Sequence, residues 1–363
     1  MAESCGNVDG EGESPDGKND FEEGVKDMFF NVKVMLIALV FGYVLVPAVA
    51  MAQSANEPPR LSDGRPDLQG VWDFKTITPL QRPVGLGDRA ELTEEEAASL
   101  EAQVERSQTA LLESIGGKIG AYNAFWFDIG TNVVESRQTS LIIDPPDGRL
   151  PSLVEGAVRQ SGSLVEDIPG DRPVRYRSGG IGLDGPEDRA LAERCLVGFN
   201  SGPPMMPSGY NNNMQLFQTS DYVVILNEMV HDARIIPLDG REHLDGLRQW
   251  MGDSRGSWDG DTLVVESRNF TDFTSSFDPG ATGGIGTGET LHLIERFTRL
   301  DENTLVYEYT VNDPNTFTRP FTVALPMRQL ELPIFEYACH EGNYGMLNLL
   351  SGARAKEVEP ATP

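Results

Sequence analysis

The segment EMVHDAR, which runs from Glu228 to Arg234, is the densest group of residues that could do chemistry. A turn or bulge there would bring His231 beside Asp232, and a carboxylate that orients an imidazole is a general-base pair. Arg234 would hold a substrate carboxylate or a developing oxyanion. Glu228 is a candidate ligand contact. The alternative interpretation is a salt-bridged strand end with no catalytic role.

A second dense segment, CHEGNYG, runs from Cys339 to Gly345. His340 and Glu341 would complete an acid–base set with the first segment, so they are candidate catalytic residues. Tyr344 is a candidate ligand contact. The alternative is a turn at a strand end that a disulfide of Cys339 holds in place.

Four further residues are candidate ligand contacts, namely Tyr210, Asn211, Asn212 and Trp250. Asn211 and Asn212 follow Tyr210 and offer amide donors and acceptors, although asparagine runs more often form turns. Trp250 belongs to a set of aromatic residues spread over the predicted strands. Most of these aromatic side chains are expected in the core, and some would line an apolar pocket.

The sequence gives little support for a metal site or a cofactor site. The four histidines stand at no metal-ligand spacing, so the sequence predicts no metal site. The motif GDSRG at 252–256 lacks the following helix of a nucleophile elbow, and GGIGTG at 283–288 lacks the helix of a dinucleotide site. We therefore expect a protein without an organic cofactor.

The charge of the chain excludes one class of partner. The 363 residues contain 29 Lys and Arg against 56 Asp and Glu, which gives a formal net charge of −27. Such a surface repels phosphate backbones, so nucleic-acid binding is not expected. The expected partner is a small-molecule ligand or substrate.

The elements that must position these residues are mainly strands. One helix is predicted after Thr93, which forms a capping box with Glu96, and it ends at Gly116. Shorter helices are predicted at Glu187–Cys195 and Asn343–Ala355. Strands are predicted at 68–72, 140–143, 214–219, 222–229, 233–237, 248–253, 262–268, 291–300, 304–312, 317–325 and 334–340. Tight turns such as those at 239–240, 259–260 and 300–303 indicate an antiparallel meander, which we expect to close as a lipocalin-like barrel.

The N-terminal region predicts export. Residues 1–27 have the composition of a disordered acidic leader, or precede a true start at Met28. Residues 28–52 have the pattern of a cleaved signal peptide, so no stable membrane insertion is expected afterwards. Residues 53–363 are predicted as one β-barrel domain with a helical and loop extension, in the periplasm or outside the cell. There Cys195 and Cys339 are candidates for a disulfide, although two buried free thiols fit equally well.

The motifs PDLQGVW, EMVHDARIIPLDGR, GDSRGSWDGDTLVVES and ACHEGNYG together resemble a family of secreted bacterial proteins with no established activity. The lipocalin likeness is an analogy of fold only. The sequence therefore favours an exported enzyme that uses His231 and Asp232 for acid–base chemistry on a largely apolar substrate, as an isomerase, lyase or hydrolase. The alternative is a periplasmic carrier of a hydrophobic ligand on the same barrel.

Overall fold

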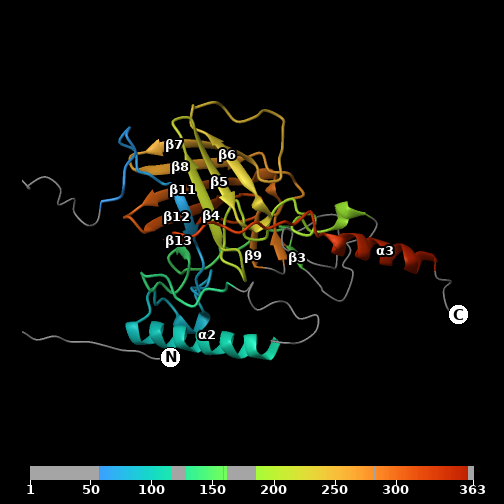
Figure 1. The fold of residues 1–363 in the computed structure, drawn as a ribbon, viewed down its shortest axis with the longest axis horizontal. Helices are drawn as coiled ribbons and strands as arrows, with labels where there is room; N and C mark the ends of the chain where they lie inside the picture. The colour runs from blue at the N-terminus through green and yellow to red at the C-terminus, as the bar shows by residue number, and fades with distance from the viewer. Residues whose placement is uncertain (1–56, 116–127, 158, 162–184, 281–282, 359–363) are drawn as a thin grey trace, which may run out of the picture. The chain divides into compact units, whose positions relative to one another are not determined.

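The computed structural model of the protein describes residues 57–115, 128–157, 159–161, 185–280 and 283–358 (Figure 1). The predicted leader (1–27) and signal peptide (28–52) lie outside these residues. The described residues all fall within one compact unit, Asn56–Pro363. Among them, no helix is both long enough and apolar enough to cross a membrane.

Antiparallel strands form most of the fold. The large sheet has the order β6-β5-β4-β1-β13-β12-β11-β8-β7, with β2 paired to β13, and a small sheet has the order β3-β10-β9. The strands are β1 (Gly70–Asp73), β2 (Ile142–Asp144), β3 (Arg159–Ser161), β4 (Asn213–Gln218), β5 (Tyr222–Asn227), β6 (Ala233–Pro237), β7 (Asp253–Asp259), β8 (Thr262–Arg268), β9 (Phe277–Gly280), β10 (Gly283–Ile285), β11 (His292–Arg299), β12 (Thr304–Asn312) and β13 (Phe321–Leu330).

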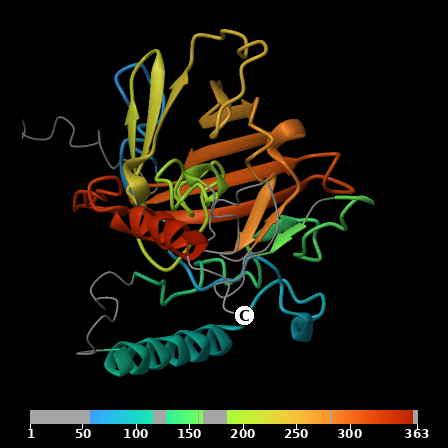
Figure 2. The same cartoon turned by 90° about the vertical axis from the view of Figure 1, so that its right-hand side faces the viewer.

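Strand β1 joins two meanders into one sheet. It pairs with β4 on one side and with β13 on the other, both antiparallel. The yellow strands β4, β5 and β6 run at a steep angle to the orange strands of the second meander (Figures 1 and 2). Side chains that alternate inward from both meanders, such as Ile225 and Phe297, form one hydrophobic core.

The predicted barrel is wrong, because the sheet stays open between β6 and β7. These two edges meet through side chains: a Cβ on Gly256 of β7 would lie 2.5 Å from Cδ2 of Leu238 and 3.0 Å from Cγ2 of Ile236. Aliphatic groups between the edges leave no room for a ladder of backbone hydrogen bonds. The chain from Leu238 to Gly252 is also too long to set the register of a hairpin. The predicted turn at 239–240 therefore joins no hairpin.

Two helices of more than one turn lie in the described part of the chain, α2 (Glu94–Ile115) and α3 (Tyr344–Val358). Both were predicted within a few residues. At the start of α2, the backbone N–H of Glu96 donates to Oγ1 of Thr93, and the backbone N–H of Thr93 donates to Oε2 of Glu96. This reciprocal pair is the capping box that the sequence indicates.

Replacement of Thr93 by alanine is expected to cost about 1 kcal/mol of local stability, because it leaves an amide of the first turn without an acceptor. The measurement is hydrogen exchange of the first-turn amides of α2. Thr109→Ala is the matched control, since the Thr109 hydroxyl donates to the carbonyl of Glu105 within the helix and caps nothing. Equal changes in the two variants would contradict the role of the cap.

Three predicted elements differ from the structure. Residues 248–252 form a turn before β7 rather than a strand, and 334–340 pair with no described strand. The predicted helix at 187–195 is reduced to a 3-10 turn, η3 (Pro186–Asp188), and further turns. Cys195 adopts a left-handed backbone with φ of 56°, which ends any helical run at the cysteine.

Candidate functional site

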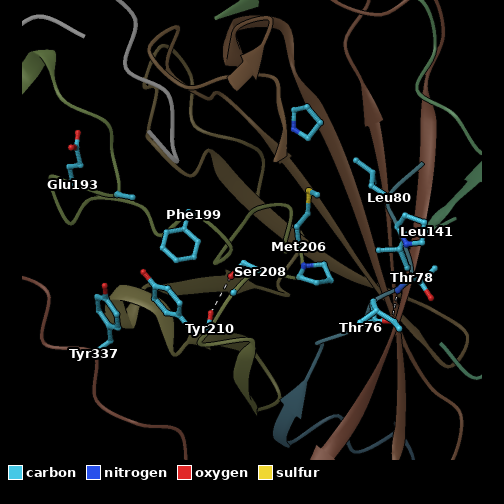
Figure 3. Close-up of a pocket in the computed structure, with 16 residues that line it drawn as sticks. Thr76, Thr78, Leu80, Leu141, Glu193, Phe199, Met206, Ser208, Tyr210 and Tyr337 are labelled. Carbon is cyan, nitrogen blue, oxygen red and sulfur yellow. Dashed lines mark hydrogen bonds between the residues drawn. The ribbon is translucent and has the colours of Figure 1, made fainter. Parts of the chain in front are cut away.

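A hollow of about 760 Å³ lies beside the sheet (Figure 3). Its walls come from residues 76–80, from the chain around Glu193 and Phe199, and from Met206–Tyr210. The labelled apolar and aromatic lining residues are Leu80, Leu141, Phe199, Met206, Tyr210 and Tyr337. Sites for small organic molecules have this size and this kind of lining.

Asparagine side chains build the wall that carries Tyr210. The Nδ2 group of Asn200 donates to the carbonyl oxygens of Tyr210 and Asn211, at 3.1 and 3.0 Å. Oδ1 of Asn212 accepts from the backbone N–H of Ser208 at 2.7 Å, and its Nδ2 donates back to the Ser208 carbonyl at 2.9 Å. The side chain of Asn212 is fully buried in this loop. Asn212 therefore shapes the wall and does not line the hollow.

Tyr210 is the predicted ligand contact that does line the hollow. Its ring meets the ring of Phe199 edge to face, with centroids 5.2 Å apart and an interplanar angle of 89°. This is a favourable geometry for two aromatic rings and fixes both of them. The pair gives the hollow a rigid aromatic side.

The Glu228 carboxylate is buried and held from three directions. Oε1 accepts from Nδ2 of Asn211 at 2.5 Å, and Oε2 accepts from Nδ2 of Asn213 at 3.2 Å. Oε2 also accepts from the backbone N–H of Phe335 at 3.1 Å. Glu228 and Asn211 therefore tie the segment after β13 to the end of β5, and this bond network leaves little capacity for a ligand.

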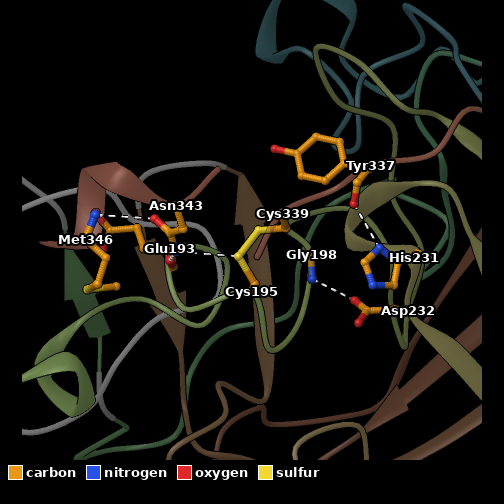
Figure 4. Close-up of a disulfide and its surroundings, with 9 residues drawn as sticks. All are labelled: Glu193, Cys195, Gly198, His231, Asp232, Tyr337, Cys339, Asn343 and Met346. Atoms are coloured by element: carbon orange, nitrogen blue, oxygen red, sulfur yellow. Dashed lines mark hydrogen bonds between the residues drawn. A yellow bond between two sulfur atoms is a disulfide. The ribbon is translucent and has the colours of Figure 1, made fainter. Parts of the chain in front are cut away.

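Cys195 and Cys339 form a disulfide (Figure 4), which confirms the candidate pair. Beside it lies a smaller hollow of about 450 Å³, which shares Ala192, Glu193 and Tyr337 with the larger one. Nδ2 of Asn343 donates to the carbonyl oxygen of Glu193 at 2.8 Å. The bridge at Cys339 therefore anchors the chain two residues from Tyr337, which lines both hollows.

The side chains of His231 and Asp232 have different bonding partners (Figure 4). Nδ1 of His231 lies 2.8 Å from the carbonyl oxygen of Tyr337, and the side chain is exposed. Oδ2 of the buried Asp232 accepts from the backbone N–H of Gly198 at 2.8 Å and from the Ser201 hydroxyl at 2.7 Å. The turn η4 (Met229–His231) thus directs the two side chains to separate segments.

Arg234 forms a buried ion pair. Its Nη1 and Nη2 donate to the two carboxylate oxygens of Glu295 at 2.7 and 2.9 Å, and the hydroxyl of Tyr307 donates to Oε1 of Glu295 at 2.7 Å. Burial acts to lower the pKa of Arg234, but the charge of Glu295 and its hydrogen bonds with Arg234 together outweigh burial, and the pKa rises. Burial, together with the charge of Glu295, raises the pKa of Tyr307 well above its ordinary value. Arg234 therefore stays charged and the Tyr307 hydroxyl stays protonated across the ordinary pH range.

The remaining predicted residues lie apart from the larger hollow. The side chains of His340, Glu341 and Tyr344 are exposed, and none of them lines it. Trp250 lines a separate cleft, where the Arg194 guanidinium lies 5.5 Å from its ring centroid. The sequence candidates are therefore divided among several places.

Several residues that the structure places in the buried network or in the lining of the larger hollow were not identified from the sequence. Glu295 is fully buried. It stands two residues from both Leu293 and Phe297, on the same buried face of β11, and this spacing is a signal that could have identified it. The hollow residues Phe199 and Met206 carry no comparable signal. Their loops meet residues 76–80 only through the tertiary fold.

Within the described ranges, no group of three or more His, Cys, Asp or Glu residues has a geometry that could hold a metal ion. Comparison with protein-family models, with curated proteins and with solved structures gives no match for this chain. The fold and the hollow are therefore the basis for any proposal about function.

Proposed function

We propose that the protein is an exported binding protein that holds a small, largely apolar molecule in the larger hollow. The observation that carries this proposal is the size and lining of that hollow. Its volume is about 760 Å³, and it is lined by the rigid Phe199–Tyr210 pair and by aliphatic groups such as Leu80 and Met206. An apolar ligand would remove this lining from water, at roughly 25 cal/mol for each Å² of apolar surface buried.

The polar groups of the hollow favour a ligand without net charge. Oε1 of Glu193 accepts from Nη2 of Arg189 at 3.1 Å, and Oε2 accepts from the backbone N–H of Ala190 at 3.1 Å. The one carboxylate of the lining is thus already paired with a guanidinium. The hydroxyl of Ser208 donates to the carbonyl of Tyr210 within its own loop. A few neutral polar contacts would orient the ligand and supply specificity.

Export is supported by the disulfide between Cys195 and Cys339. Disulfides persist in oxidising compartments such as the periplasm and the cell exterior. This agrees with the signal peptide that the sequence predicts. We therefore place the binding function in the periplasm or outside the cell.

An acid–base enzyme centred on His231 has less support than a binder. His231 does not line the larger hollow, and its Nδ1 is bonded to a backbone carbonyl. The carboxylate of Asp232 is bonded to Gly198 and Ser201. If the protein converts a bound molecule and His231→Ala abolishes that turnover, the acid–base enzyme becomes the better proposal.

The hollow can be filled from Gly209, because a Cβ at this position meets no atom within 4 Å. We expect Gly209→Phe to weaken binding of the neutral apolar probe N-phenyl-1-naphthylamine at least tenfold, which corresponds to about 1.4 kcal/mol. The measurement is fluorescence titration. Native mass spectrometry of the protein purified from the periplasm should in parallel show a retained organic mass.

Gly85→Phe is the matched control, because a Cβ at Gly85 also meets no atom within 4 Å and Gly85 does not line the hollow. This variant should bind the probe as the wild type does. Equal affinity of Gly209→Phe and the wild type would refute the hollow as the binding site.

A further inference from the structure

A second cleft, of about 520 Å³, opens where the two edge strands β6 and β7 face each other. Leu196, Arg234, Arg248 and Trp250 are among its lining residues, and it shares none of its lining with the larger hollow. This cleft exists because the sheet does not close into a barrel. It is a separate site from the one that the proposed function uses.

The cleft is locally basic in an otherwise acidic protein. Nη1 of Arg248 donates to the carbonyl oxygens of Phe270 and Glu289, at 2.9 and 2.8 Å, which holds its guanidinium at the cleft. The Arg194 guanidinium lies over the ring of Trp250. Neither arginine forms an ion pair with a carboxylate of the described residues. On a chain with a formal net charge of −27, Arg248 in the cleft lining and Arg194 beside the lining residue Trp250 favour an anionic ligand.

Arg234 itself lines the cleft. Its two Nη atoms are bonded to Glu295, but its Nε–H has no hydrogen-bond partner among the described residues, and the residue is 5% exposed. This Nε is closed off from solvent, so a ligand in the cleft does not reach it, and Arg234 contributes only part of the cleft wall.

The acidic and hydroxyl groups of the cleft are already satisfied. Oδ1 of Asp253 accepts from Nη1 of Arg255, and its Oδ2 accepts from the backbone N–H of Leu244 at 2.7 Å. The hydroxyls of Ser254 and Ser267 are hydrogen-bonded to each other at 2.7 Å. The charge of Asp253 is therefore balanced by Arg255 and does not oppose an anion.

We propose that the β6–β7 cleft binds a planar organic monocarboxylate. The carboxylate accepts hydrogen bonds from the guanidinium of Arg248, which lines the cleft. The apolar body of the ligand packs against Trp250 and Leu196. Charge-assisted bonds to arginine give the recognition of the anion, and the indole supplies flat apolar contact area.

The test is isothermal titration calorimetry of the whole protein with 2-naphthoate and with its neutral analogue 2-naphthamide. We expect 2-naphthoate to bind at least tenfold more tightly than 2-naphthamide, with an affinity that falls as salt is added. Arg248→Gln should weaken 2-naphthoate binding at least tenfold and leave 2-naphthamide binding unchanged. The glutamine keeps an amide donor but removes the charge.

Two controls separate this site from other effects. Arg241→Gln removes a charge from an exposed arginine that pairs with Asp239 and does not line the cleft, so 2-naphthoate affinity should not change. Gly209→Phe, which fills the larger hollow, should also leave 2-naphthoate binding intact. If Gly209→Phe abolishes that binding, or if Arg248→Gln has no effect on it, the cleft is not the site and the inference is wrong.

Discussion

Exchange of both disulfide cysteines for serine, as Cys195→Ser/Cys339→Ser, is expected to lower the free energy of unfolding by about 4–5 kcal/mol. The bridge joins residues separated by 144 positions. Without it, the unfolded chain regains the conformational entropy that closure of so long a loop removes. Equilibrium unfolding in urea, followed by tryptophan fluorescence, measures the loss.

The same variant should also loosen one segment of the folded protein. Residues 331–343 pair with no described strand, and their links to the body include the bonds from Phe335 to Glu228 and from His231 to the Tyr337 carbonyl. We expect amides of this segment to exchange faster in the serine variant than those of β11 and β12. Because Tyr337 lines the larger hollow, binding of the neutral probe should weaken as well.

Reduction of the wild-type protein provides the control. Dithiothreitol should destabilise the wild type to the level of the double-serine variant and should have no effect on the variant itself. An unchanged urea midpoint in the variant, with the wild type oxidised, would show that the bridge contributes nothing to stability.

The second large effect is expected at the buried pair of Arg234 and Glu295, whose side chains are 4% and 0% exposed. Arg234→Met leaves the Glu295 carboxylate buried without a counter-charge, and we expect a loss of about 3–5 kcal/mol in the free energy of unfolding. Among the side chains of the described residues, the hydroxyl of Tyr307 then still donates to Glu295. A hydrogen bond from one hydroxyl cannot replace a bidentate guanidinium.

A double-mutant cycle separates the charge effect from loss of packing. Arg234→Met/Glu295→Gln removes both charges while the amide oxygen still accepts from Tyr307, so the double variant should be more stable than Arg234→Met alone. We expect a coupling energy of about 2 kcal/mol between the two positions. Additive losses in urea unfolding would mean that the pair makes no net electrostatic contribution.

Local signals predicted parts of the fold correctly. Thr93 and Glu96 are three residues apart, and their capping box begins α2 as expected. The alternation in β8 and β12 and the tight turn at 259–260 also appear in the structure. These features depend on contacts within a few residues, so the sequence contains all the information needed.

The candidate site was less predictable. Tyr210 was found as a lining residue, but Asn212 proved to be a loop-building residue and Glu228 the centre of a buried network. A polar residue type indicates that hydrogen bonds will form, and it does not say with which segment. For Glu228 the partners come from β4, its preceding loop and the segment after β13.

By itself the sequence determined the main helix, most strands and the two cysteines available for a bridge. Only the tertiary structure decided that β1 lies between β4 and β13, that the sheet stays open between β6 and β7, and that Cys195 pairs with Cys339. Local elements follow from short-range backbone and side-chain preferences. The hollow and the cleft form where segments far apart in the chain meet, and those meetings depend on how the whole core packs.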